Sequence, residues 1–202
     1  KGRRWHSLAK KGLYVSFLLR PPAGFFHLIP LAAGLAAAEA IETLTRLPIN
    51  LKWPNDLLFK GKKLGGILCE SETSQLSQAC VIAGFGINLN HHQQDFPPEL
   101  VGLVNSVYLI SGKSYQPEEL FPLLGKQFQF WYNKIKEGQI NLIVGRFEQK
   151  LFFSPGQTLI IKEPAGEVKG KFIGLGQDGS LIMKIGQENK KYYTSEIIKV
   201  IH

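Results

Sequence analysis

The sequence is poor in sulfur-containing residues. Its 202 residues include two cysteines and one methionine. Cys69 and Cys80 are flanked by apolar residues and have neither a CxxC spacing nor a histidine cluster, which argues against a zinc site and a disulfide scaffold. We therefore expect two buried free thiols in a reducing compartment, the cytoplasm.

The sequence also lacks a long uninterrupted apolar run. Residues 21–38 form the longest nearly uncharged stretch, but prolines, glycines and a histidine interrupt it. A membrane-spanning helix needs about 20 apolar residues. We therefore expect no transmembrane segment and no membrane partner.

Acidic residues are fewer than basic ones. Lys and Arg total 24 against 16 for Asp and Glu, which gives a net charge of +8 and favours an anionic partner such as phosphate, nucleotide or nucleic acid. Hydrophobic residues at 44% and charged residues at 20% are typical of a globular protein and exclude disorder, collagen and coiled coil.

Residues 1–152 predict a sheet with helices. Apolar and β-branched segments predict strands at 12–20, 49–53, 65–71 and 79–89. A helix is expected from Pro30 to Pro48. Residues 97–102 show no regular apolar spacing and predict a loop. We infer an α+β fold, with helices packed on a mixed, largely antiparallel sheet.

Two further helices are predicted before residue 152. The first begins near Pro117 and the second follows Gly138. The first carries an apolar stripe with the spacing of one helix face, formed by Leu120, Leu124, Phe128, Trp131 and Ile135.

The pattern changes at residue 153. Short strands are predicted at 158–162, 168–174, 180–184, 191–194 and 197–201, and Asp178-Gly179 is a hairpin signal. Five strands in about fifty residues predict a small β-barrel. We therefore expect two domains, 1–152 and 153–202.

Three segments could carry chemistry. Lys-Trp-Pro-Asn-Asp at 52–56 predicts a strand followed by a rigid polar corner. A hairpin follows, in which Lys63 lies close to Gly65 and Gly66. Gly84 and Gly86 lie in an apolar strand, where missing Cβ atoms let a ligand approach the backbone. A cation beside such a surface suits a carboxylate or phosphate.

These segments, in this order, resemble the biotin protein ligases, the biotin–[acetyl-CoA-carboxylase] ligase family. The family carries Lys-Trp-Pro-Asn-Asp, then Lys-Leu-Gly/Ala-Gly-Ile-Leu, then Gly-Ile-Asn, as found here at 52–56, 63–68 and 86–88. Residues 2–7 are similar to the end of the family's Gly- and Arg-rich adenylate-binding loop, so we expect an N-terminally incomplete ligase domain. The family also ends in an SH3-like barrel, which matches the predicted C-terminal strands.

The resemblance implies an ATP-dependent ligase. Such an enzyme activates biotin as biotinyl-5'-AMP and transfers it to a lysine of a biotin carboxyl carrier protein. Lys63 is then the catalytic cation that touches the biotin carboxylate and the phosphate, and Asp56 orients the acceptor lysine. The glycines line the biotin slot: Gly65, Gly66, Gly84 and Gly86.

The resemblance also implies a nucleotide site and a metal cofactor. The resemblance implies that the nucleotide is contacted by residues of the segments 2–7, 52–56 and 86–88. These residues are Arg3, Arg4, Trp5, Asn55 and Asn88. Mg²⁺ is expected to be held mostly by phosphates and water, because the sequence has no dedicated metal cluster. The oligomeric state is left open between monomer and homodimer.

Three alternatives remain open from the residues alone. A lipoate ligase or octanoyltransferase shares the acyl-to-lysine chemistry, although Lys-Trp-Pro-Asn-Asp argues against both. A non-catalytic biotin or nucleotide sensor is the second. A basic nucleic-acid module is the third, but the barrel lacks an interleaved Arg and aromatic stripe, so nucleic-acid binding is not evident.

Overall fold

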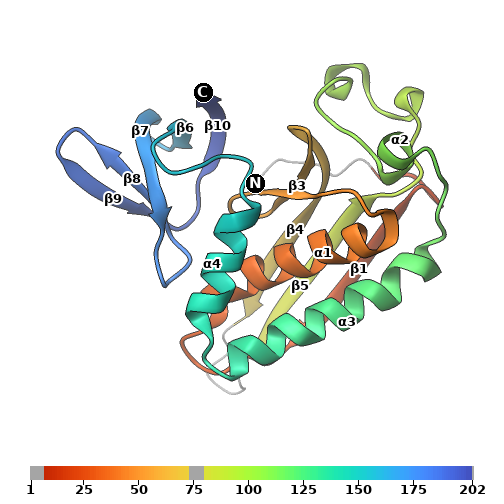
Figure 1. The fold of residues 1–202 in the computed structure, drawn as a ribbon, viewed down its shortest axis with the longest axis horizontal. Coiled ribbons are helices and arrows are strands. Elements are labelled where there is room, and N and C mark those ends of the chain that lie inside the picture. Colours follow the sequence, from red (N-terminus) through yellow and green to blue (C-terminus); the bar gives the residue numbers. More distant parts are fainter. Residues whose placement is uncertain (1–6, 73–79, 202) are drawn as a thin grey trace.

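The computed structural model describes residues 7–72 and 80–201. Two five-stranded antiparallel sheets account for the strands of this part of the chain, with helices between them in sequence (Figure 1). The predicted fold class, α+β with a C-terminal β-structure, is confirmed.

The first sheet, sheet A, has the strand order β1-β5-β4-β3-β2. Every neighbouring pair in it is antiparallel. All four predicted strands are present, and a fifth, β3, starts at Asp56, where the sequence predicts a turn. The strand bounds are β1 (Gly12–Leu19), β2 (Asn50–Lys52), β3 (Asp56–Phe59), β4 (Lys62–Glu72) and β5 (Cys80–Asn88).

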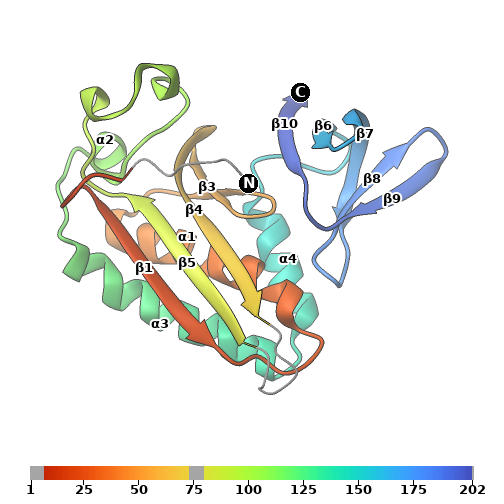
Figure 2. The ribbon, with the colours of Figure 1, turned by 180° about the vertical axis from the view of Figure 1, so that it is seen from behind.

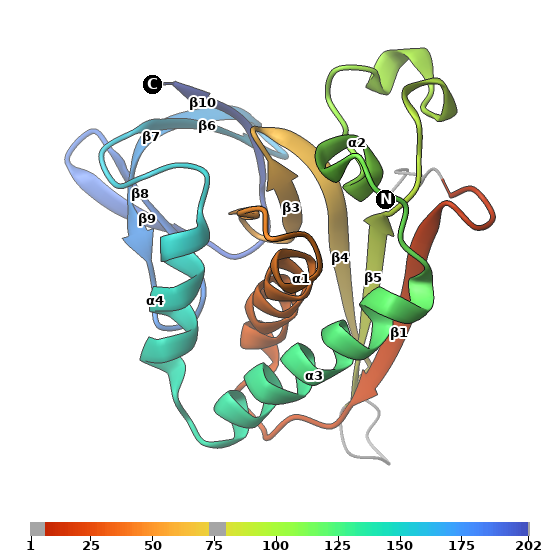
Figure 3. The same cartoon turned by 45° about the vertical axis from the view of Figure 1, so that its right-hand side comes forward.

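Helices cover one face of sheet A. α1 (Ile29–Thr45) and α3 (Pro117–Lys136) lie across this face, and α4 (Ile140–Lys150) follows α3 (Figure 3). Seen from behind, β1, β5 and β4 present their other face without a covering helix (Figure 2). We call this second face the open face.

The apolar pattern explains these positions. α1 is rich in small residues and buried over most of its length, whereas α3 buries one stripe, the five residues predicted from sequence. The short helices α2 (Val107–Ser111), η1 (Phe26–Leu28), η2 (Gln93–Asp95) and η3 (Pro98–Leu100) were not predicted. These helices are too short to show a repeating pattern of apolar residues in the sequence.

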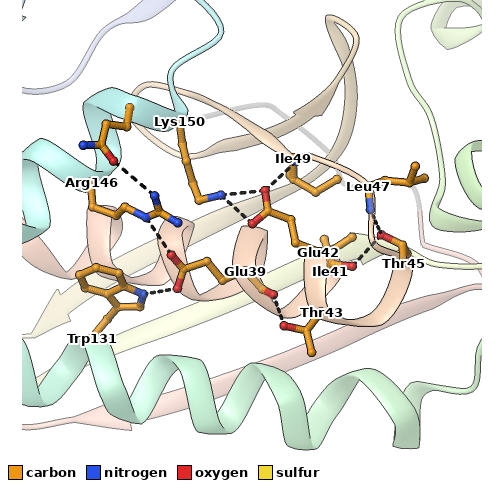
Figure 4. Close-up of polar contacts among 11 residues, drawn as sticks. Glu39, Ile41, Glu42, Thr43, Thr45, Leu47, Ile49, Trp131, Arg146 and Lys150 are labelled. Carbon is orange, nitrogen blue, oxygen red and sulfur yellow. Dashed lines mark hydrogen bonds and ion pairs between the residues drawn. The ribbon is translucent and has the colours of Figure 1, made fainter.

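Acidic residues of α1 connect the three long helices (Figure 4). Glu39 accepts hydrogen bonds from Trp131 Nε1 at 2.8 Å and Arg146 Nε at 3.1 Å. Glu42 accepts two from Lys150 Nζ, each 2.7 Å long, and Lys150 is buried. Because a buried ammonium needs a paired carboxylate, these contacts fix α4 against α1.

The apolar stretch Phe26–Thr45 passes the length and composition test for a membrane span, since it continues beyond residue 38. In the folded chain, 67% of its most apolar window is buried inside the protein. A mostly buried core helix has the same length and apolar composition.

The C-terminal sheet has the strand order β10-β6-β7-β8-β9. The predicted strand at 191–194 was placed too late, because Ile185 pairs with Glu188 across a two-residue turn. The other four strands lie where predicted. The bounds are β6 (Thr158–Glu163), β7 (Gly166–Leu175), β8 (Leu181–Ile185), β9 (Glu188–Tyr192) and β10 (Glu196–Ile201).

Both cysteines are free thiols, as predicted, but they are half-buried rather than buried. Cys69 lies against the core, and burial raises its pKa to about 12. Its thiolate form is therefore scarce at neutral pH.

Candidate functional site

A bulge in β4 brings Lys63 to the open face. Leu57 pairs with Gly65 but Leu58 pairs with Lys63, so Leu64 is an extra residue in β4. In a regular strand, residues three apart point to opposite faces. The extra residue changes this alternation, and Lys63 Nζ lies 3.5 Å from the position that a Cβ of Gly66 would occupy.

Lys63 forms an ion pair with Asp56. Its Nζ is 2.6 Å from Asp56 Oδ1, and the two side chains are 36% and 22% exposed. Asp56 pairs with Gly66 across the β3–β4 ladder, so both charges stand over the backbone of Gly66. The two predicted catalytic residues are thus in direct contact and accessible to solvent.

Glycines form the floor of the open face beside this pair. Gly66 pairs with Gly86, and Gly86 pairs in turn with Tyr14. In the next row on this face, Gly84 lies between Leu68 and Ser16. A Cβ at Gly84 would have only ordinary contacts, the nearest at 3.5 Å. Neither packing nor backbone conformation therefore explains this glycine.

Partly exposed apolar side chains flank the glycine floor. Tyr14 is 41% and Leu68 is 61% exposed, and Leu18 pairs with Ile82 further along the same face. The alternate residues of β5, Ala83, Phe85 and Ile87, are buried under the helices. The open face therefore combines an apolar surface with one ion pair at its edge.

Gly65 differs from the other predicted glycines. It is buried, and a Cβ there would lie 2.6 Å from the Gly86 carbonyl oxygen. Because such a distance is shorter than any real Cβ contact, close strand packing requires this glycine. Its predicted role in lining a biotin slot has a competing structural explanation.

The corner, residues 53–56, is held to β4 by its backbone and by Asn55. Asn55 Nδ2 donates to the Ile67 carbonyl oxygen at 2.6 Å, and Ile67 N–H donates to the Asn55 carbonyl oxygen at 2.9 Å. The Trp53–Pro54 peptide bond is cis. The Asn55 amide thus has a structural partner beside Asp56.

Residues 103–105 complete the surroundings of Lys63, and the sequence analysis missed them. Lys63 N–H donates to the Leu103 carbonyl oxygen at 2.9 Å, and Asn105 N–H donates to the Lys63 carbonyl oxygen at 2.7 Å. Asn88, which is buried, donates from Nδ2 to the Asn105 carbonyl oxygen at 3.1 Å. No local pattern in this loop signals such a contact.

The remaining predicted site residues, Arg3, Arg4 and Trp5, lie outside the described residues. Across residues 7–72 and 80–201, no group of three or more His, Cys, Asp or Glu side chains is placed to hold a metal ion. The described part of the site can therefore offer one ammonium, one carboxylate and backbone groups to an anionic ligand with an apolar body.

Known proteins are similar to this chain in sequence and in fold. A profile described as the Biotin/lipoate A/B protein ligase family matches residues 1–88. The Bifunctional ligase/repressor BirA of Bacillus subtilis is 29% identical over 197 residues, and the match covers 96% of this chain and 60% of that protein. The chain thus spans about three fifths of the length of the Bacillus relatives it matches.

Two further relatives are covered more fully. The Biotin--[acetyl-CoA-carboxylase] ligase of Paracoccus denitrificans is 30% identical over 191 residues, covering 91% of this chain and 78% of that protein. The structure of the Aquifex aeolicus biotin protein ligase in complex with biotin and ATP matches with a TM-score of 0.82 and 33% identity. That match covers 96% of this chain and 79% of the Aquifex chain. The chain therefore belongs to the biotin protein ligase family.

Proposed function

We propose that the protein is an ATP-dependent ligase that activates biotin as biotinyl-5'-AMP and transfers it to a lysine of a biotin carrier protein. The observation that carries the proposal is the Lys63–Asp56 ion pair at the edge of the glycine floor. Family membership, and an Aquifex relative solved with biotin and ATP, support it.

Biotin has an apolar body and a terminal carboxylate, and the open face offers a complement to each. The ring system and chain would lie over Gly66, Gly84 and Gly86, because a glycine presents only its backbone to a ligand. The carboxylate would reach the Lys63 ammonium by displacing water or competing with Asp56. Burial of the apolar body supplies affinity, and the ammonium fixes the orientation.

Lys63 then acts in the first step. The biotin carboxylate oxygen attacks the α-phosphorus of ATP, a P–O bond forms, and the bond to the departing pyrophosphate breaks. Both partners are anionic, so a fixed ammonium between them lowers the repulsion that opposes their approach. The chain would hold this cation through the two backbone hydrogen bonds to residues 103–105.

Asp56 acts in the second step. The acceptor lysine attacks the biotinyl carbonyl carbon as a neutral amine, and AMP leaves. A nearby carboxylate orients the incoming ammonium and helps remove its proton. Asp56 lies within reach of any group that approaches Lys63, because their charged atoms are 2.6 Å apart.

The nucleotide and the metal are assigned by extension of the same proposal. Arg3 and Arg4 would contact phosphates, and Trp5 the adenine. Mg²⁺ would be held largely by phosphate oxygens and water, which fits the absence of an acidic cluster within residues 7–72 and 80–201. It would neutralise charge on the departing pyrophosphate.

The test is a pair of half-reaction assays on the full 202-residue chain. Exchange of labelled pyrophosphate into ATP should depend on biotin, and labelled biotin should appear on the lysine of a purified carrier domain. Exchange that depends instead on lipoate or octanoate would assign a different acyl substrate. Biotin binding without exchange would make the chain a sensor, and no response to any of these acids would refute the proposal.

A further inference from the structure

A turn of the C-terminal sheet contacts the corner of the candidate site. Trp53, at the start of the corner, is 1% exposed, and its Nε1–H donates a 3.0 Å hydrogen bond to the Gly179 carbonyl oxygen. Gly179 lies in the turn between β7 and β8, residues 176–180. A residue 126 positions away thus contacts the segment that carries Asp56.

The turn is held by hydrogen bonds within itself and to β9 and the residues after it. Gly176 N–H donates to the Ser180 carbonyl oxygen and Gly179 N–H to the Gly176 carbonyl oxygen, each at 2.8 Å. Asp178 accepts hydrogen bonds from the Ser180 hydroxyl, Lys191 Nζ and the Tyr193 hydroxyl. Although burial by itself raises the pKa of Asp178, these bonds outweigh it and hold that pKa well below its usual range.

Gly179 is required where the turn meets sheet A. Its φ is +71°, a conformation that residues with a side chain rarely adopt. A Cβ there would also lie 3.4 Å from Leu31 of α1 and 3.6 Å from the His27 carbonyl oxygen. The turn is therefore set closely against the start of α1 as well as Trp53.

Trp53 is part of the buried core but also borders a cavity. A cavity of about 330 Å³ lies beside the contact, lined among others by Pro54, Cys69, Asp178 and Tyr193. A second connection lies two residues before Trp53, where Phe152 N–H donates to the Leu51 carbonyl oxygen at 3.0 Å. Two directional hydrogen bonds from outside sheet A thus hold the end of β2.

We propose that the β7–β8 turn is a positioning element for the ligase site, acting through the Gly179–Trp53 hydrogen bond on the corner and so on the Asp56–Lys63 pair. The path continues from Trp53 to Asn55, whose backbone and amide bind Ile67, and then to Asp56. Trp53 and Asp178 are positioning residues, since neither touches the reacting groups. The catalytic part of this inference rests on the proposed function.

The test combines kinetics with hydrogen exchange. Trp53→Phe removes the indole N–H and keeps an aromatic ring. We expect about tenfold faster exchange of the Ile67 amide, which reports on its bond to Asn55. We also expect kcat for carrier biotinylation to fall about tenfold while KM for biotin changes by less than about twofold.

Ser195→Ala is the matched control. It removes the 2.6 Å hydrogen bond from the Ser195 hydroxyl, between β9 and β10, to Glu163 of β6, and neither residue lines the cavity beside Trp53. We expect it to leave Ile67 exchange and kcat unchanged. If Trp53→Phe does not fold, Asp178→Ala replaces it, because it loosens the turn from a partly exposed position and should shift both readouts in the same direction.

The outcomes separate this inference from the proposed function. A folded Trp53→Phe protein with unchanged Ile67 exchange overturns the inference, whatever its activity. Faster exchange with unchanged kcat also overturns it, because the corner would then move without consequence for the reaction. If the wild-type chain has no ligase activity, the proposed function fails, and Ile67 exchange still decides whether the turn holds the corner.

Discussion

Sheet A and the C-terminal sheet have the same number of strands and the same antiparallel pairing, but Gly84 of sheet A differs from Gly170 of the C-terminal sheet. In the C-terminal sheet, a Cβ at Gly170 would lie 2.9 Å from Ile185, Met183 and the Lys184 carbonyl oxygen, so packing requires that glycine. In sheet A, Gly84 has no contact closer than 3.5 Å. Glycine in a strand points to a ligand only where nearby atoms do not already account for it.

The carboxylates of the two regions also differ in how many hydrogen-bond partners they have. In the C-terminal sheet, Asp178 accepts hydrogen bonds from three side chains, which leaves it little capacity for another partner. In sheet A, Asp56 and Lys63 form one solvent-accessible pair over a glycine. A saturated carboxylate stabilises a turn, whereas an accessible ion pair can exchange its partner for a ligand.

Removing the Lys63 charge should have the largest effect. Lys63→Met keeps most of the side-chain bulk but removes the charge. It should raise the activation free energy of adenylate formation by about 3–5 kcal/mol, as expected for losing one preorganised charge. Biotin-dependent pyrophosphate exchange measures the loss, and thermal unfolding should show a folded protein. A folded variant with an unchanged exchange rate would remove Lys63 from the catalytic residues.

Neutralising Asp56 should separate the two half-reactions. Asp56→Asn keeps the shape but removes the charge that faces Lys63, and should slow carrier biotinylation by roughly a hundredfold, the range of general acid–base catalysis. Adenylation should slow less, because Lys63 remains. The two rates are measured separately on one preparation. Equal slowing would instead place Asp56 on the nucleotide or the metal.

The two kinds of glycine in sheet A can be compared directly. Gly65→Ala places a Cβ against the Gly86 carbonyl oxygen and should lower the free energy of unfolding by about 1–3 kcal/mol, as overpacking does. Gly84→Ala should leave that free energy nearly unchanged and weaken biotin binding by about tenfold, or about 1.4 kcal/mol. Denaturant unfolding and calorimetric titration with biotin measure the two effects. The opposite pattern would contradict the assignment of the open face.

The smallest expected effect is the change with pH in the stability that Asp178 contributes to the folded protein. Its pKa is lowered in the folded state, so its hydrogen bonds stabilise the protein fully above the ordinary carboxyl pKa of about 3.9. This contribution is lost as pH falls below that value toward the folded-state pKa. The difference in unfolding free energy between wild type and Asp178→Ala should therefore be constant near neutrality and shrink below about pH 4. A difference that grows on acidification would contradict the bonding found here.

Helices and strands whose apolar residues recur at regular spacing were predicted correctly. The α3 stripe is correct residue by residue, because a long amphipathic helix repeats its apolar positions over several turns. β3 was missed because Asn55-Asp56 has turn chemistry, and pairing with β2 and β4 makes Asp56 a strand residue nonetheless. The early start of β9 was missed because a two-residue turn is shorter than the polar segment that signalled it.

Local sequence predicted every strand of the described residues except β3, the three long helices, the family motifs and the presence of Lys63, Asp56 and the glycines in one hairpin and one strand. These depend on residues close together in the chain. Only the folded structure shows that the β4 bulge turns Lys63 to the open face, that Gly65 is buried while Gly84 is not, and that the β7–β8 turn binds Trp53. The bulge depends on strand register, and the other two contacts join residues 21 and 126 positions apart, so no local periodicity encodes them.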